Sequence, residues 1–152
     1  MAIIGVFLVA LLLMTPMLAQ GQTLFGGPTV VDDPTKAADY VQTESLIPLV
    51  EGVTVLGVVD GGFQDRFVQI KLEVPDDVTL RRVLDSLAVT PDGFVPGENA
   101  QMTIAAAPFW NPDEYAPMPV AQGRLLGFSF VNVGLARPEK SRTLLFILAF
   151  QT

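Results

Sequence analysis

The sequence predicts a mainly β protein of the α+β class, in which an N-terminal hydrophobic helix precedes a single β-sandwich-like domain with two short helices. Residues 68–74 alternate between apolar and polar side chains, which is the period of a β-strand. Residues 144–150 are apolar at every position, as is typical of a strand buried on both faces. Residues 35–46 and 76–89 carry apolar side chains at helical spacing. The first segment follows Asp33 and Pro34, and the second begins with Asp76.

Aspartate and proline residues mark the start of both predicted helices. We expect Asp33 to cap the first helix and Pro34 to occupy its first position, where a missing N–H costs nothing. Asp76 and Asp77 place negative charge at the positive end of the second helix dipole. The face of that helix that packs against the core is predicted from four apolar residues, Leu80, Val83, Leu84 and Leu87.

A β-hairpin is predicted where Asp60, Gly61 and Gly62 form a turn between residues 53–59 and 63–74. In its second strand one face is apolar and should meet the core, with residues Val68, Ile70, Leu72 and Val74. The opposite face is polar and is expected to meet water, with residues Gln69, Lys71 and Glu73. The second strand is therefore expected to be half buried.

Three further segments complete the expected sheet. Residues 101–107 are predicted to form a strand, and the proline-rich residues 108–123 a loop without regular structure. Residues 124–133 are predicted to form a strand with apolar side chains on both faces. Residues 143–150 are expected to form an interior strand, because so apolar a segment would be an aggregation hazard at an open edge.

Residues 1–19 carry no charge, and as a helix they would span roughly 28 Å, close to the bilayer core of about 30 Å. A cleaved signal peptide is the alternative, with Pro16 as helix breaker and Ala19 as cleavage residue. The lack of a basic residue before the apolar run argues against a signal peptide and equally against a spanning anchor. Met17 is large for a cleavage site, and we expect the helix to be retained. The residues predicted to anchor it in lipid or among apolar helices are Ile3, Ile4, Val6, Phe7, Leu8, Leu11, Leu12 and Leu13.

Composition assigns residues 1–19 to this helix, 20–34 to a Gly-, Thr- and Pro-rich linker and 35–152 to one globular domain. A short strand is expected within the linker, at residues 29–31. The net charge is −7, and the only adjacent basic pair, Arg81 and Arg82, lies in a predicted helix, so nucleic acid is not an expected partner. The chain has neither cysteine nor histidine, which excludes disulfides, thiolate and imidazole metal sites and histidine-based triads. Half of the residues are apolar, which favours a chain that is covered by other subunits or by lipid.

The sequence contains no catalytic or cofactor motif. Each pair of neighbouring carboxylates fits a turn or a helix cap, and none has the spacing of a calcium loop, so neither a metal nor a cofactor is predicted. The candidate contact residues lie in the proline-rich loop: Phe109, Trp110 and Tyr115. They suit the surface of a partner protein, a membrane interface or a sugar, or they form a lid over one end of the sheet.

The function expected from these features is that of a non-catalytic structural subunit. An uncleaved hydrophobic helix would hold it in an extracellular filament, a membrane-containing virion or a membrane complex, among copies of itself or other subunits. The protein would then be membrane-associated or extracellular, with its acidic domain on the outer side. The alternative is an exported accessory or ligand-binding domain whose N-terminus is a signal peptide.

Overall fold

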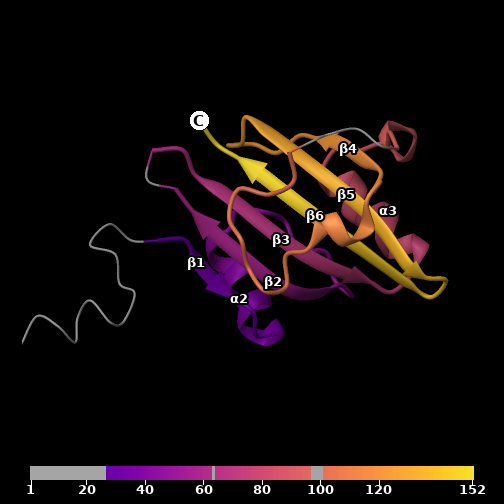
Figure 1. Ribbon diagram of the computed structural model, residues 1–152, viewed down its shortest axis with the longest axis horizontal. Coiled ribbons are helices and arrows are strands. Elements are labelled where there is room, and N and C mark those ends of the chain that lie inside the picture. The colour runs from indigo at the N-terminus through magenta and orange to yellow at the C-terminus, as the bar shows by residue number, and fades with distance from the viewer. Residues whose placement is uncertain (1–26, 63, 97–100) are drawn as a thin grey trace, which may run out of the picture.

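The computed structural model describes residues 27–62, 64–96 and 101–152 (Figure 1). The predicted hydrophobic helix at residues 1–19, with all its anchor residues, lies outside the described residues. The described part is built on one six-stranded antiparallel sheet with the strand order β1-β2-β3-β6-β5-β4. With two short helices beside this sheet, the prediction of a mainly β, α+β protein is confirmed.

The strands are β1 (Thr29–Val31), β2 (Thr54–Gly61), β3 (Phe67–Val74), β4 (Val120–Gly123), β5 (Phe130–Glu139) and β6 (Arg142–Phe150). The α-helices are α2 (Pro34–Glu44) and α3 (Asp77–Ser86), and two 3₁₀ turns are η1 (Pro91–Gly93) and η2 (Pro112–Tyr115). Within the described ranges, no helix is long and apolar enough to cross a bilayer.

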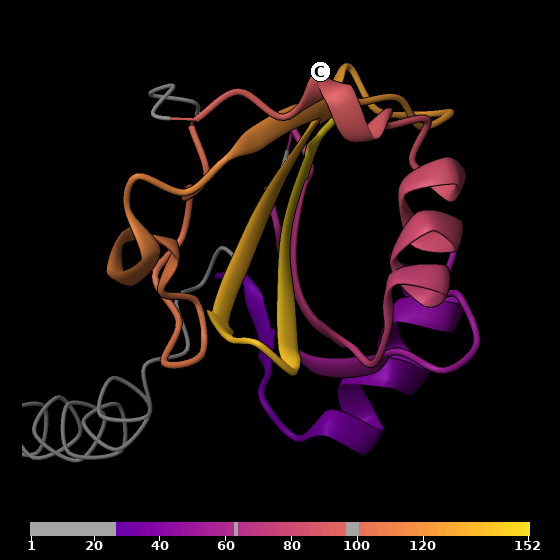
Figure 2. The same ribbon diagram turned by 90° about the vertical axis from the view of Figure 1, so that its right-hand side faces the viewer.

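Both faces of the sheet are covered by the chain itself. Figure 2 shows α2 and α3 on one face and the loop of residues 101–118 on the other. The larger core cluster lies between the sheet and the helices, and its buried members include Val41 of α2, Val83 of α3 and Ile70 of β3. Each side chain of this size contributes about 1.5–3 kcal/mol when fully buried, so this face supplies much of the stability.

The helix caps form as predicted. The Asp33 Oδ1 atom accepts a hydrogen bond from the Lys36 N–H at 2.9 Å, and Pro34 is the first residue of α2. The Asp76 Oδ1 atom accepts from the Thr79 N–H at 2.7 Å. Because the first N–H groups of a helix have no partner inside the helix, these carboxylates fix where α2 and α3 begin.

The last strand occupies the interior of the sheet, as predicted. β6 pairs with β3 on one side and with β5 on the other, and the side chains of Phe146 and Leu148 are 0% exposed. The hairpin of β2 and β3 also forms, but Asp60 and Gly61, predicted to lie in its turn, are the last residues of β2 and pair with Val68 and Phe67 of β3. β1 pairs with β2, so the short strand expected at residues 29–31 belongs to the sheet.

Three predictions for the second half of the chain are wrong. Residues 101–107 form no strand, and β4 lies inside the range expected to lack regular structure. The strand expected at 124–133 begins only at Phe130, because Gly127 adopts a φ of +89° in a turn that leaves Leu126 fully exposed. Positive φ favours glycine, so Gly127 was the local signal for that turn.

The expected half-burial of the second hairpin strand is also wrong. The side chains of Gln69 and Lys71, predicted to face water, are 0% and 7% exposed. The alternation of apolar and polar residues correctly placed them on the face opposite the helices. Because the 101–118 loop covers that face, both side chains are buried and need partners in the loop.

Candidate functional site

The loop of residues 101–118, called the cover loop here, lies across the sheet face opposite the helices (Figure 2). The loop and the sheet together form a second hydrophobic cluster, whose buried members are Met102, Trp110 and Met118 of the loop with Val120, Ala136, Leu144 and Phe146. All three predicted contact residues belong to the cover loop. The structure therefore brings them to one face of the domain.

Trp110 forms the centre of this layer. Its side chain packs edge-on against Phe146, with ring centroids 5.4 Å apart, and the residue is only 6% exposed. Its Nε1–H donates to the Met102 carbonyl and to the Thr103 hydroxyl, each at 3.0 Å. A buried indole with a satisfied N–H is the arrangement expected of a lid on the sheet.

Phe109 and Tyr115 lie beside Trp110 and are each half buried. Phe109 packs directly on Gly57 of β2, where a Cβ atom would lie 2.6 Å from its ring. Tyr115 packs on Phe146 with ring centroids 5.6 Å apart. Their remaining exposed surface is where the predicted partner contact would have to form, and that contact stays a prediction.

Gln69 holds the first part of the cover loop in place. Its side-chain oxygen accepts from the N–H groups of Ile104 and Ala105 at 2.7 and 2.8 Å, and its Nε2 donates to the Ala105 carbonyl at 2.9 Å. Buried backbone groups need partners, and here one amide side chain supplies three hydrogen bonds that a neighbouring strand would otherwise make. Residues 101–107 thus stay close to the sheet without forming a strand.

Lys71, on the same face of β3 as Gln69, holds the second part of the loop. Its Nζ donates to the Phe109 carbonyl at 3.0 Å and to the Asn111 Oδ1 atom at 2.6 Å. The ammonium also lies over the rings of Phe146 and Tyr115, 5.0 and 5.9 Å from their centroids.

Charges near Lys71 act on its pKa in opposite directions. Burial is the largest influence and lowers the pKa, because it removes the ammonium from water. The Glu114 carboxylate opposes this effect and Arg142 adds to it, with the net result that the pKa is lowered. Glu114 also accepts a hydrogen bond from the Asn111 Nδ2 atom, so Lys71, Asn111 and Glu114 form one connected cluster.

Sequence reasoning missed this cluster. Lys71 and Asn111 are separated along the chain by the whole of α3, and strand periodicity does not reveal what covers a polar face. The available signal was a pair of long polar side chains, Gln69 and Lys71, on the strand next to the fully apolar β6. The sheet partner of a strand buried on both faces is itself expected to be covered on both faces.

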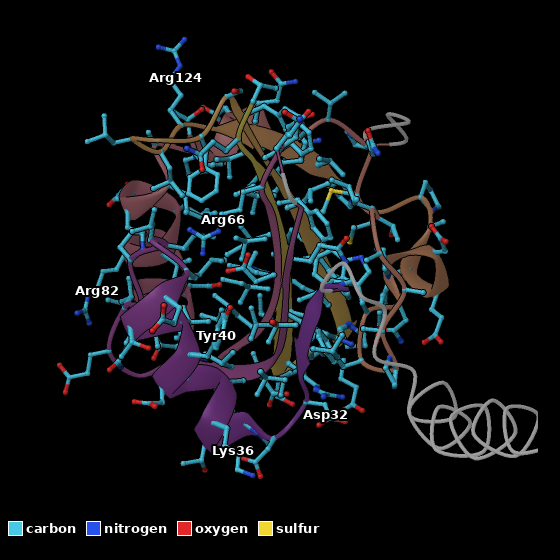
Figure 3. The ribbon with its side chains drawn as sticks, turned by 90° about the vertical axis from the view of Figure 1, so that its left-hand side faces the viewer. Asp32, Lys36, Tyr40, Arg66, Arg82 and Arg124 are labelled. Atoms are coloured by element: carbon cyan, nitrogen blue, oxygen red, sulfur yellow. The ribbon has the colours of Figure 1, made fainter. Side chains whose placement is uncertain are left out.

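A second polar cluster lies between α2 and the hairpin. The Asp60 carboxylate, in a residue 8% exposed, accepts from Arg66 Nε and Nη2 at 3.0 and 2.5 Å and from the Tyr40 hydroxyl at 3.3 Å. Arg66 Nη2 also donates to the Glu44 carbonyl at 2.5 Å, at the end of α2. Burial, together with the charge of Asp60, raises the pKa of Tyr40. Figure 3 shows Tyr40 and Arg66 in this region, where the cluster ties α2 to the sheet.

Other surface features carry less chemistry. Arg82 lies on the outer side of α3 and Arg124 points away from the domain (Figure 3). In the described part of the chain, no three acidic side chains converge as metal ligands would. A hollow of about 140 Å³ lies between α3 and Leu135, smaller than the roughly 300–1,000 Å³ of typical small-molecule sites.

Comparisons of the chain with protein-family models, with curated proteins and with solved structures gave no match.

Proposed function

We propose that this chain is a non-catalytic structural subunit, held in a larger assembly by residues 1–19 as an uncleaved hydrophobic helix. The observation that carries the proposal is the run of nineteen uncharged residues, which only nine residues, 20–28, separate from β1. So short a connection would keep the sheet next to the bilayer or next to the apolar helices of neighbouring subunits. The acidic domain then lies on the outer side of the membrane or assembly.

The architecture of the domain supports this proposal. Its buried polar side chains brace one part of the fold against another: Gln69 and Lys71 hold the cover loop, and Asp60 with Arg66 holds α2. Both sheet faces are filled by the chain's own side chains. Such a rigid and internally braced domain suits a subunit whose task is to keep its shape.

The alternative function, an exported accessory or ligand-binding domain, requires cleavage of the N-terminal segment. Pro16 and Ala19 are the residues that favour it, because a helix breaker shortly before a small residue is typical of signal peptides. The two functions differ in whether residues 1–19 are needed once the protein has reached its destination.

Val9→Arg tests the anchor, with Val9→Ala as the matched control. On the membrane-insertion scale a mid-helix Arg costs about 2.5–3.5 kcal/mol, whereas apolar residues are favourable. We expect Val9→Arg to lose incorporation into the membrane fraction or assembly, while Val9→Ala is incorporated like the wild type. Incorporation of the Arg variant at the wild-type level would contradict the proposal.

A further inference from the structure

Lys71 and Asn111 meet in a geometry that brings a nucleophile against an electrophile. Lys71 Nζ lies 2.6 Å from the carboxamide oxygen of Asn111. The carbon of that carboxamide is one C=O bond of about 1.23 Å further away, so the N···C distance is at most about 3.8 Å. Reacting atoms about 3–3.5 Å apart define a near-attack arrangement, which a small rotation of either side chain would reach here.

The side chains around this contact leave little of Lys71 open to solvent. Lys71 is 7% exposed, and the rings of Phe146 and Tyr115 lie beside its Nζ atom. The Phe109 carbonyl, 3.0 Å from Nζ, holds the amine in position. An amine held in place beside a carboxamide meets the entropic requirement that makes intramolecular acyl transfer fast.

Glu114 supplies a proton carrier at the same place. It lies three residues after Asn111 in the 3₁₀ turn η2, where residues three apart share one side, and its carboxylate accepts from the Asn111 Nδ2 atom. Glu114 is exposed, so its outer side meets water. A carboxylate in contact with the leaving nitrogen can pass to it a proton that the carboxylate first takes from the attacking amine.

We propose that Lys71 and Asn111 form an intramolecular isopeptide bond, assisted by Glu114. The neutral Lys71 amine attacks the Asn111 side-chain carbon, forming the Nζ–Cγ bond and a tetrahedral intermediate. Glu114 takes one proton from Nζ and passes it to Nδ2, the Cγ–Nδ2 bond breaks, and ammonia leaves toward solvent. One amide replaces another, so the step needs neither oxidant, reductant nor co-reactant.

Burial favours the reactive form of the amine. Because burial lowers the pKa of Lys71, a larger fraction of the side chain is uncharged near neutral pH than for a lysine in water. The cation–π contacts with Phe146 and Tyr115 oppose this by stabilising the ammonium. Formation of the amide would remove the buried charge altogether, and with it the cost of keeping an ammonium away from water.

The bond would join the sheet to the cover loop covalently. It would close the chain between positions 71 and 111, across α3, and restrain the unfolded state as a disulfide does. The sequence has no cysteine, so no disulfide can supply such a link. This inference does not depend on the fate of residues 1–19.

Mass spectrometry of the full-length protein under denaturing conditions tests the proposal. After prolonged incubation at neutral pH, the wild type should be lighter than its sequence mass by one ammonia. Trypsin should then yield a branched peptide that joins residues 67–81, uncut after Lys71, to residues 83–124. Separate unlinked peptides, 67–71 and 72–81, would overturn the proposal.

Peptide mapping also identifies other sources of ammonia loss. Succinimide formation at an asparagine gives the same deficit without a branch. A mass deficit without the branched peptide would therefore overturn the proposal. An unchanged mass, equal to that of the sequence, would overturn it as well.

Glu114→Ala is the informative variant, because Glu114 is exposed and its replacement should leave the fold intact. We expect the branched peptide to disappear or to form at least tenfold more slowly, within the range of general acid–base contributions. Lys71→Arg should abolish it. Unchanged formation in Glu114→Ala would refute the role of Glu114, and a branched peptide in Lys71→Arg would refute the assignment of the bond.

Discussion

Phe146 is the residue on which the packing between the cover loop and the sheet depends most. It lies in the middle of β6, is 0% exposed, and contacts Trp110, Tyr115 and the Lys71 ammonium. Replacing it by alanine removes the ring that all three groups share. We expect Phe146→Ala to lower the free energy of unfolding more than any other single aromatic truncation in the cover-loop layer.

The size of the loss follows from these contacts. Truncating a buried Phe costs about 3–5 kcal/mol, depending on how far the surroundings collapse into the cavity. Collapse is restricted here, because β6 is hydrogen-bonded to β3 and β5 on its two sides. Two aromatic pairs, each worth about 0.5–1.5 kcal/mol, are lost as well, so we expect a value near the upper limit, about 5 kcal/mol.

Urea unfolding of the full-length protein measures this loss. The single tryptophan, Trp110, packs on Phe146 and reports the transition by fluorescence, and circular dichroism provides a second probe. Phe150→Ala is the matched control on the same strand, since Phe150 is only half buried and stacks on Phe130. A loss below about 2 kcal/mol for Phe146→Ala, or a larger loss for Phe150→Ala, would refute the reasoning.

Three further predictions concern the loop and the helix caps. Gly57→Ala should lower the melting temperature by pushing on the Phe109 ring, and a double-mutant cycle with Phe109→Ala should remove most of that penalty; additive effects would contradict the contact. Trp110→Ala should lower the melting temperature strongly, as expected for a lid, whereas an unchanged melting temperature with weaker assembly would favour the contact interpretation. The hydrogen bond from the Thr79 N–H lowers the pKa of Asp76. Its ionised form therefore stabilises the fold above the ordinary aspartate pKa, and the advantage of wild type over Asp76→Asn in melting temperature should vanish as pH falls through the folded-state pKa; a constant difference would contradict this.

The sequence predicted those elements whose determinants are local. The caps at Asp33 and Asp76 place both helices without any knowledge of the tertiary structure. The two glycines after Asp60 indicated the first hairpin, although β2 extends through Gly61, further than predicted. The interior position of β6 was also predictable, because a strand apolar on both faces has to be covered on both.

The elements on the opposite face were mispredicted because long-range contacts decide them. Residues 101–107 have the alternation of a strand, but Gln69 satisfies their backbone groups and no strand pairing is needed. Leu126 belongs to an apolar run, but the turn at Gly127 exposes it completely. Tertiary contacts override strand propensity in such segments.

Sequence reasoning did not bring Lys71, Asn111 and Glu114 together for the same reason. Each residue taken alone fits an ordinary surface position, and only the folding of the cover loop onto β3 brings them together. The aromatic residues could be found from the sequence as a group. The sequence left open whether they form a contact surface or a lid, and only the structure shows that Trp110 is buried against the sheet.

The native N-terminus provides the most direct test of the proposed structural role. Intact-mass measurement and N-terminal sequencing should be carried out on protein isolated from its native membrane or assembly. We predict a chain that retains residues 1–19, together with a detergent-extractable or assembly-bound state that depends on them. A mature chain that begins at Gln20 or later would contradict the anchored-subunit proposal.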